Sequence, residues 1–444
     1  MTVFYLPIEH STRELTAKVF LANRLAQEGH IPIIFRSDIL DTTGWPSAGV
    51  YIGKNCFRTE WPYSLKYYKK MKSSGVDLWH LDEEGGILYG RDEEEWKKRI
   101  ATRLDPTSLD SNDKILTWGE WQAESFSSKK PTAEIRIVGS PLFDLFQKKY
   151  AIHLSEFDDR QTEGLKDFIL LNSNFSHSNG TMTVDMLLGE NRSSSKIDDR
   201  LKIAKRFVAD GQLLYSFIKL IQELSEKLPD EQLVLRPHPA ENIELYKKLL
   251  IDCKNVNIVK RGEAASWIRR CKCLISNGSS TALQAKIFGK KVFAFVPFKR
   301  NDDRTMALPN DLGVKFSSVD ELLNKINDPQ ADDLKVWSRT ISKLDSIEEI
   351  VSLASESSIN YASKEEIVFR NLNKSLRKFY FKEALKNFIR PLFTEKRNNY
   401  LMYMEHFDPE FFSLANDLNN SACSFWDSQI KLKPIGRNCY VFSS

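Results

Sequence analysis

Short apolar runs alternate with amphipathic stretches along the first part of the chain. TVFYLPI, HIPIIF, AGVYIG, VDLWHL, KILTWG and EIRIVG have the pattern of buried strands, and stretches with helical periodicity separate them. The stretch 11–27 also carries helix boundary signals, because Ser11 or Thr12 can cap it, Glu14 lies in its first turn and Gly29 follows its end. Strands that alternate with helices at this spacing predict βαβ units and a parallel sheet.

A second series of the same kind follows the polar stretch 154–165. DFILLNSNF, EQLVLRPHP, VNIVK, CKCLISN and KVFAFVP are its predicted strands. We therefore expect an α/β protein with two tandem Rossmann-like domains, 1–158 and 159–335, and a helical C-terminal extension, 336–444. Two such domains are expected to face a shared cleft, since ligands of open α/β sheets bind at the carboxyl ends of the strands.

The extension differs from the rest of the chain in charge. From 364 to 397 there are ten Lys or Arg and four Asp or Glu, a local net charge of +6. A basic amphipathic helix of this kind can lie on an anionic membrane surface. The alternative is a helix packed across the two domains with a solvated basic face.

Composition narrows the protein's class. The chain has 444 residues, 41% of them hydrophobic and 28% charged, which argues against disorder. The net charge of +4 is too small for a dedicated nucleic-acid binder, so no nucleic-acid partner is expected. No stretch of about 18 apolar residues is visible, so no membrane-spanning helix is expected, and no secretory signal is visible either. The six scattered cysteines are expected to be free thiols in a reducing compartment. These features predict a cytoplasmic protein.

The first candidate site is the sequence Arg236-Pro237-His238-Pro239, directly after a predicted strand. The two prolines exclude a helix here and hold the imidazole of His238 in a stiff, extended loop. His238 could donate a hydrogen bond to a phosphate oxygen, and Arg236 could add a fixed positive charge. A structural histidine at a strand end is the alternative.

The second candidate site is the loop Ser276–Thr281, between a strand and a helix. Gly278, Ser279, Ser280 and Thr281 would offer backbone N–H groups and hydroxyls to an anion, or simply cap the helix. Both loops follow strands of one predicted domain, which favours a shared nucleotide site. Asn172, Ser173 and Asn174 end the first strand of that domain and could reach the same ligand, and 176–198 is a candidate flap.

The His-Pro loop and the Ser-Ser loop, about 40 residues apart, carry a family resemblance. The chain resembles glycosyltransferases of two Rossmann-like domains (the GT-B type) that use CMP-activated acidic sugars, namely bacterial sialyltransferases and Kdo transferases. In those families the two loops hold the cytidine phosphate, which the resemblance carries onto His238-Pro239 and Ser279-Ser280. The run WIRRCKCLISNGSSTALQAKIFGKKVFAF is also shared in outline with CDP-glycerol transferases.

The first domain is similar to bacterial surface-carbohydrate proteins thought to resemble retaining β-Kdo transferases. The phrases IEHSTRELTAKVFLANRLAQEGH, LDEEGG, TWGEWQAE and VGSPLFDLF carry this similarity, which covers about 1–335. The chain departs from the pattern at Ser140, where Asn is expected, and at Leu142, where Arg is expected. Either change could alter an acceptor contact or only a structural turn.

The acidic loop after VDLWHL is the candidate catalytic element. Retention at an anomeric carbon requires a carboxylate nucleophile or front-face departure assisted by the donor. Asp82, Glu83 and Glu84 lie close together in this loop, so repulsion should raise at least one pKa. We expect Glu83 or Glu84 to be the nucleophile or general acid/base, in either order; an exposed acidic turn is the alternative.

Three residues at the end of the first strand are candidates for sugar or acceptor binding. Arg13 could pair with the carboxylate of an acidic sugar, and Glu9 could bind the acceptor or transfer a proton, with His10 beside it. Arg13 and Glu14 could equally be ordinary first-turn helix residues. The seven histidines do not cluster, and no metal or other cofactor is implied.

Together these features predict a retaining glycosyltransferase that moves Kdo or a related ulosonic acid from CMP to a surface glycan or lipid-linked acceptor. The alternatives are a CDP-alditol or UDP-sugar transferase of the same fold and a non-catalytic glycan-binding relative.

Overall fold

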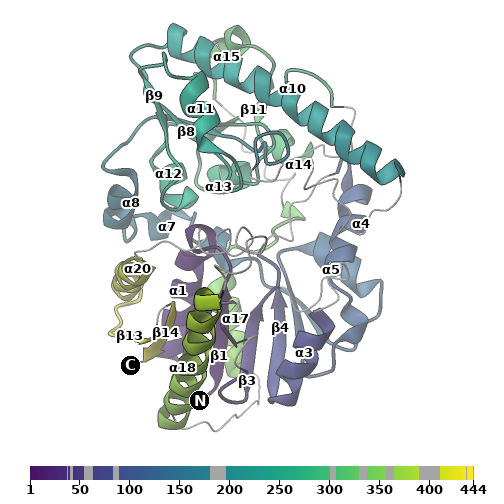
Figure 1. The fold of residues 1–444 in the computed structure, drawn as a ribbon, viewed down its shortest axis with the longest axis vertical. Coiled ribbons are helices and arrows are strands. Elements are labelled where there is room, and N and C mark those ends of the chain that lie inside the picture. The colour runs from purple at the N-terminus through teal and green to yellow at the C-terminus, as the bar shows by residue number, and fades with distance from the viewer. Residues whose placement is uncertain are drawn as a thin grey trace. The chain divides into compact units, whose positions relative to one another are not determined.

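The structure is a computed structural model and describes residues 1–37, 39–40, 44–54, 64–83, 90–180, 197–300, 307–329, 338–356, 365–389, 411–436 and 438–443. Its contacts divide the chain into two compact units (Figure 1). Unit 1 comprises Met1–Gly86, Ile100–Phe157 and Ser338–Ser444, and unit 2 comprises Ile87–Arg99 and Asp158–Trp337. The predicted α/β fold class with two Rossmann-like domains is confirmed.

Unit 1 is built on an eight-stranded sheet in the order β13-β14-β2-β1-β3-β4-β5-β6. Its parallel part consists of β1 (Val3–Ile8), β2 (Ile31–Arg36), β3 (Gly49–Gly53), β4 (Val76–Leu81), β5 (Lys114–Thr117) and β6 (Glu134–Ile137). Because the chain runs from β1 to β2 on one side and then to β3 on the other, the direction of winding reverses between β1 and β3. The carboxyl ends at such a reversal are the usual ligand site of an open α/β sheet.

Helices lie between these strands and after the last of them, and two of these helices extend into the residues of unit 2. They are α1 (Ser11–Gln27), α3 (Ser64–Ser73), α4 (Glu93–Arg103), the 3-10 turn η1 (Pro106–Ser108), α5 (Glu120–Ser127), α6 (Pro141–Asp144), α7 (Lys148–Ala151) and α8 (Ser155–Thr162). The α1 helix is buried along most of its length, and this burial includes the charged residues Glu14 and Lys18. Burying a charge is unfavourable unless it is paired, so these two positions mark a polar site inside the unit.

The C-terminal extension is not wholly helical, which corrects the expectation from the sequence. It contains α17 (Ser346–Glu356), α18 (Glu365–Ile389) and α20 (Phe411–Trp426), and it ends in two strands, β13 (Lys431–Gly436) and β14 (Cys439–Ser443). The β14 strand pairs antiparallel with β2, with Cys439 opposite Phe35, so the extension completes the first sheet (Figure 1). An antiparallel strand at the edge of a mostly parallel sheet is a common arrangement.

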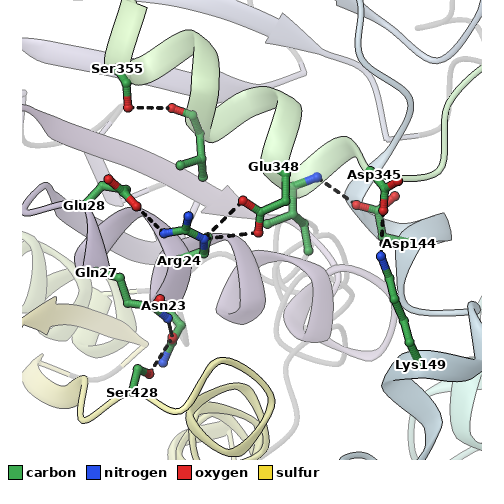
Figure 2. Close-up of polar contacts among 12 residues, drawn as sticks. Asn23, Arg24, Gln27, Glu28, Asp144, Lys149, Asp345, Glu348, Ser355 and Ser428 are labelled. Carbon is green, nitrogen blue, oxygen red and sulfur yellow. Dashed lines mark hydrogen bonds and ion pairs between the residues drawn. The ribbon is translucent and has the colours of Figure 1, made fainter.

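Polar contacts attach the extension to α1 (Figure 2). Asn23, fully buried on α1, donates to Asn419 of α20 over 2.8 Å, and Asn419 donates to the carbonyl oxygen of Ile430 over 2.8 Å. Arg24 contacts Glu348 of α17 through both carboxylate oxygens, at 3.1 and 3.2 Å. Buried polar groups need partners, so these contacts fix the position of the extension on unit 1.

Unit 2 has a six-stranded parallel sheet in the order β12-β11-β10-β7-β8-β9. Its strands are β7 (Ile169–Asn172), β8 (Leu233–Arg236), β9 (Val256–Ile258), β10 (Cys273–Ser276), β11 (Lys291–Phe295) and β12 (Val314–Phe316). Numbered along the unit, this is the Rossmann order 3-2-1-4-5-6, with the reversal between β7 and β10. The helices are α10 (Ile197–Lys227), α11 (Ile243–Leu249), α12 (Ala264–Arg270), α13 (Thr281–Ile287), α14 (Ala307–Asp311) and α15 (Val319–Lys325).

The cysteines and the helices of the described residues agree with two expectations from the sequence. The described cysteines (Cys253, Cys271, Cys273, Cys423, Cys439) are free thiols, as expected. Among the described helices, none combines the length and apolar character needed to cross a bilayer.

Candidate functional site

The candidate nucleotide site lies at the carboxyl ends of β7, β8 and β10 in unit 2. Strand register places Asn172, Arg236 and Ser276 side by side at these ends, because Asn172 pairs with both of the others. Each strand is followed by one of the polar loops identified in the sequence. The site therefore lies where the winding of the sheet reverses, as expected for a ligand site of this fold.

The loop after β10 is linked to β7 by side-chain hydrogen bonds. The amide of Asn172 donates to the hydroxyl of Thr281 over 2.9 Å, and that hydroxyl donates to Ser279 Oγ over 2.8 Å. Gly278 has φ +95°, a conformation that other residues rarely adopt, so it gives the loop its turn. The Oδ1 atoms of Asn172 and Asn277 are buried without a hydrogen-bond partner among the described residues. Such groups are expected to gain a partner when a polar ligand binds.

The loop after β8 holds His238 in one tautomer. The backbone N–H of Ala240 donates to His238 Nδ1 over 3.2 Å, so the proton of the neutral imidazole is on Nε2. The His238 side chain is exposed, as is that of Pro239. An Nε2–H donor on an exposed ring suits the predicted contact with a phosphate oxygen.

Glu241, which was not predicted from the sequence, connects the loops after β7 and β8. Its carboxylate is fully buried and accepts from Ser173 Oγ, the N–H of Phe175, the N–H of His238 and the hydroxyl of Tyr246. Burial raises the pKa of Glu241, and these donors partly offset the effect. In the sequence, Glu241 is linked to the site only by its position three residues after His238. That position does not predict a buried acid.

Arg236, predicted to add positive charge at a phosphate, contacts the segment after β9 in this structure. Its guanidinium donates to the carbonyl oxygens of Arg261 and Gly262, over 2.7 and 3.0 Å, and lies over the ring of Trp267. These contacts use the planar fork of arginine to anchor the segment after β9. In this structure Arg236 therefore anchors the segment after β9, and its contact with a phosphate stays a prediction.

A cavity of about 220 Å³ lies on the β10–β11 side of the same edge. Asn174 and Asn277 line it, which connects it to the loops described above; Ser280 follows in the second of these loops. Its other lining residues include Phe295, Phe298 and Arg300, from β11 and the segment after it. This wall was not predicted from the sequence, although the run PFKR shortly after a predicted strand combines a turn residue with basic side chains.

Asp210 of α10 fixes one wall of this cavity. It accepts from the N–H and the hydroxyl of Ser178, both over 3.1 Å, and lies 3.5 Å from Arg300. The candidate flap 176–198 begins at this wall, and its residues 181–196 lie outside the described residues.

Unit 1 contains a second polar site, at the reversal between β1 and β3. Lys54, directly after β3, lies 2.8 Å from Glu9 Oε2 and 3.4 Å from Glu14 Oε1. The backbone N–H of Glu9 donates to Glu14 Oε2 over 2.8 Å. Glu9 thus belongs to a largely buried ion-pair network, and its neighbour His10 is the N-cap residue of α1.

Glu83, two residues beyond β4, is the described member of the predicted catalytic pair Glu83 and Glu84. Its Oε1 lies 2.7 Å from Lys18 Nζ, and its Oε2 is buried with no hydrogen-bond partner among the described residues. Burial raises the pKa of Glu83, and Lys18 offsets part of that rise while Glu14 adds to it. A raised pKa is one of the properties of a carboxyl group that transfers protons in catalysis.

Glu83 and Arg13 line one small cavity in unit 1, together with Lys18. Ser140 and Leu142, the two positions at which the chain departs from the family pattern, line the same cavity. Arg13 lies 3.7 Å from Glu14, with about a third of its side chain exposed. The structure thus brings together residues 13, 83, 140 and 142, which are far apart in the sequence.

The other acidic residues of the loop differ from Glu83. Asp82 forms a two-point ion pair with Arg103, at 2.5 and 3.0 Å. Burial alone would raise the pKa of Asp82, but Arg103 outweighs burial and the pKa is lowered. This ion pair holds the Asp82 carboxylate in place, and a catalytic part for Asp82 beside Glu83 and Glu84 stays a prediction. Glu84 lies outside the described residues.

One group of carboxylates has the spacing of a metal site, but a lysine lies among them. The carboxylates of Asp77, Asp110 and Asp113 lie within 4.8 Å of one another. Lys72 Nζ lies 3.0 Å from both Asp110 and Asp113 and also bonds Asp77. The protein's own ammonium group thus lies among these carboxylates and offsets part of their charge.

No protein-family model matches the sequence, and no curated protein matches it. Several solved structures are similar over most of the chain. The UDP-GlcNAc 2-epimerase of Methanocaldococcus jannaschii, in complex with UDP-GlcNAc and UDP, is 11% identical over 80% of this chain and 99% of its own, with a TM-score of 0.44. The Neisseria meningitidis UDP-GlcNAc 2-epimerase bound to UDP-GlcNAc is 11% identical over the same shares, with a TM-score of 0.46.

The wall teichoic acid polymerase TagF, soaked with CDPG, is 12% identical over 80% of this chain and 88% of its own, with a TM-score of 0.44. At these scores and identities the similarities assign no activity to the chain.

Proposed function

We propose that the protein is a glycosyltransferase that binds a nucleotide-activated sugar in unit 2 and uses a carboxylate of unit 1 in catalysis. The observation that carries the proposal is the arrangement at the reversal point of the unit 2 sheet. There Asn172, Thr281 and Ser279 form a hydrogen-bonded series, and His238 is held with Nε2 as donor. The Ser279 hydroxyl at the end of this series and the Nε2–H of His238 are donors suited to a leaving phosphate, so we propose that protein groups hold it without a metal or other cofactor.

We propose a CMP-activated Kdo or related ulosonic acid as the donor. This choice rests on the resemblance of the His-Pro and Ser-Ser loops, and Arg13 in the unit 1 cavity supports it as a cation suited to a sugar carboxylate. A CDP-alditol or a UDP-sugar is the alternative donor for the same nucleotide site. A non-catalytic glycan-binding protein is the alternative outside enzymes.

We further propose that configuration is retained through a covalent intermediate. The Glu83 carboxylate would form a bond to the anomeric carbon while the bond from that carbon to the phosphate oxygen breaks, and the electron pair would leave with CMP. The acceptor hydroxyl would then attack the same carbon and release the glutamate. Glu84 would take the hydroxyl proton, or the two residues would exchange these roles.

The acceptor we propose is a surface glycan or a lipid-linked glycan, reached at the cytoplasmic face of the membrane. An enzyme that modifies a lipid-linked acceptor has to work at the membrane surface, and the basic extension provides charge of the right sign for peripheral contact.

The test is hydrolysis of CMP-Kdo, CMP-sialic acid, CDP-glycerol and UDP-GlcNAc by the whole chain, followed by mass spectrometry of the protein. We expect hydrolysis of CMP-Kdo and a sugar adduct on Glu83 or Glu84. Glu83→Gln should lower the rate by at least a hundredfold, whereas Glu94→Gln, at an exposed glutamate, should leave it unchanged. Turnover of another donor would select the alternative transferase, and binding of no CMP compound would overturn the proposal.

A further inference from the structure

The outer face of α18 combines positive charge with exposed apolar side chains. Arg370, Lys374, Arg377, Lys378 and Lys382 are all exposed or nearly so, and Glu366 is the one acidic residue with a described, exposed side chain on this helix. Ile367 and Phe381 are 43% and 71% exposed. No ion pair joins any of these five cations to another described residue.

These side chains lie on one side of the helix. At 100° per residue, positions 367, 370, 374, 377, 378, 381 and 382 fall within an arc of about 140°. The opposite side carries the buried residues Val368, Leu372, Leu376 and Phe379. The helix is therefore amphipathic in an unusual sense, because its outer face is both cationic and partly apolar.

The inner side of α18 is fixed to unit 1. Asn371 donates to the carbonyl oxygen of Pro46 over 2.9 Å, and Arg36 of β2 lies over the ring of Phe379. The helix also packs on the edge strand β13 (Figure 1). Because the inner contacts hold the helix in place, its outer face is presented as a preformed surface.

We propose that this face of α18 docks on an anionic lipid bilayer. The cations match the negative charge of the lipid headgroups, and Phe381 and Ile367 can enter the boundary between headgroups and acyl chains. A nucleic acid would also attract the cations, but it would offer no apolar region to Phe381 and Ile367. The lipid surface is therefore the occupant that matches both components of the face.

The biological reason for docking rests on the proposed function, because a lipid-linked acceptor lies at a membrane surface. Docking itself depends on α18 alone, and no α18 residue belongs to either candidate site.

The experiment measures binding of the full chain to sedimenting vesicles of phosphatidylcholine with and without a quarter of phosphatidylglycerol. We expect binding only to the anionic vesicles, weakened at 0.5 M salt because exposed charges are then screened. Each cation near such a surface contributes about fivefold in partitioning, so Arg377→Gln/Lys378→Gln should weaken binding about 25-fold. Phe381→Ser should weaken it as well, at unchanged charge.

Matched controls lie on α11 in unit 2. Lys247→Gln/Lys248→Gln removes two adjacent exposed cations, and Leu249→Ser removes an exposed apolar side chain. These variants should bind vesicles as the unchanged chain does. Since all substituted side chains are exposed, thermal unfolding should be unaffected in both sets.

The proposal would be overturned if the α11 and α18 variants lost vesicle binding equally, or if the chain bound no vesicles at all. Preferential binding of a duplex nucleic acid that the α18 variants abolish would also overturn it. Donor hydrolysis without vesicles should be the same in every variant. Vesicle binding without any hydrolysis would leave docking supported and would count against the glycosyltransferase.

Discussion

Lys18 Nζ lies 2.7 Å from Glu83 Oε1 and 3.0 Å from the carbonyl oxygen of Ile52. The lysine is thus held by β3 and presented to the loop after β4, so Glu83 has one oxygen bound and the other without a partner among the described residues. Unequal environments for the two oxygens leave one of them available to a substrate while the other fixes the position of the carboxyl group.

Lys18→Met should destabilise unit 1 in a pH-dependent way. Burial already raises the pKa of Glu83, and losing Lys18 should raise it further. A group with a raised folded-state pKa loses its contribution to stability as pH rises through that pKa, so the loss should be larger at pH 8 than at pH 5. Removing one partner of a buried pair costs about 3–5 kcal/mol.

Urea unfolding at the two pH values measures this effect. Lys66→Met, at an exposed lysine of α3, is the control and should change little. The double variant Lys18→Met/Glu83→Gln should be more stable at pH 8 than Lys18→Met alone; equal stability would mean that the pair is not coupled.

Asp144 should make stability depend on pH near neutrality. Its Oδ2 accepts the N–H of Ile347 over 2.7 Å at the start of α17 (Figure 2), and burial raises its pKa to about 7. Because the folded-state pKa lies above the unfolded value, this residue favours folding at low pH and loses that contribution between about pH 4 and pH 7.

Asp144→Asn keeps an acceptor oxygen for Ile347 and removes the charge, so it should stabilise the protein at pH 8 by a few kcal/mol (about 1.4 kcal/mol per pKa unit) and have little effect at pH 4. Denaturant midpoints at both pH values test this. Asp345→Asn, at the exposed partner of Lys149, is the control; a gain of the same size there would refute the assignment to Asp144.

Glu241→Gln should weaken nucleotide binding without touching the nucleotide. One amide oxygen cannot accept from all of the groups that now donate to Glu241, so the loops carrying Ser173 and His238 should lose their common anchor. We expect at least a tenfold loss in CMP affinity by calorimetry. Glu244→Gln, on the exposed side of the same region, should leave the affinity unchanged.

Asn419→Leu should destabilise the attachment of the C-terminal extension. The substitution removes these two hydrogen bonds and leaves the Asn23 amide and the Ile430 carbonyl oxygen only their weaker contacts with Cys423 Sγ, at a cost of about 1–3 kcal/mol for each buried group. Thermal unfolding should show a large decrease in Tm. Asn420→Leu is the matched control, since its side chain is exposed; if both variants behave alike, the buried contacts do not determine the stability.

The fold was largely predictable from the sequence because local pattern and sheet burial agree. The strands at Val3–Ile8 and Ile169–Asn172 are fully buried, and such strands are continuous apolar runs. The strand Lys431–Gly436 was missed because it combines lysines with a proline at a sheet edge, where polar residues are normal. Its partner Cys439–Ser443 pairs with Ile33, Ile34 and Phe35, a long-range contact that no local pattern reveals.

The sequence predicted where the polar residues of the candidate sites lie, but it did not predict which groups they contact. Arg236 and Asp82 both lie at strand ends as expected, yet each is engaged by a partner that sequence spacing could not identify, Gly262 in one case and Arg103 in the other. Glu241 and Lys18 were not predicted as site residues, because a charged residue near a helix start or inside a helix is usually solvated.

The C-terminal strand of unit 1 constrains how the protein can be made. A ribosome delivers unit 2 completely before it reaches Ser338, whereas the β2 edge and the buried Asn23 must wait for the last hundred or so residues. At about 5–20 residues per second that interval lasts roughly 5–20 s, during which an unpaired strand edge is open to other chains. The incomplete chain, before β14 has been made, is therefore the form of this protein that is most exposed to association with other chains. Chaperone binding would be most effective at that time.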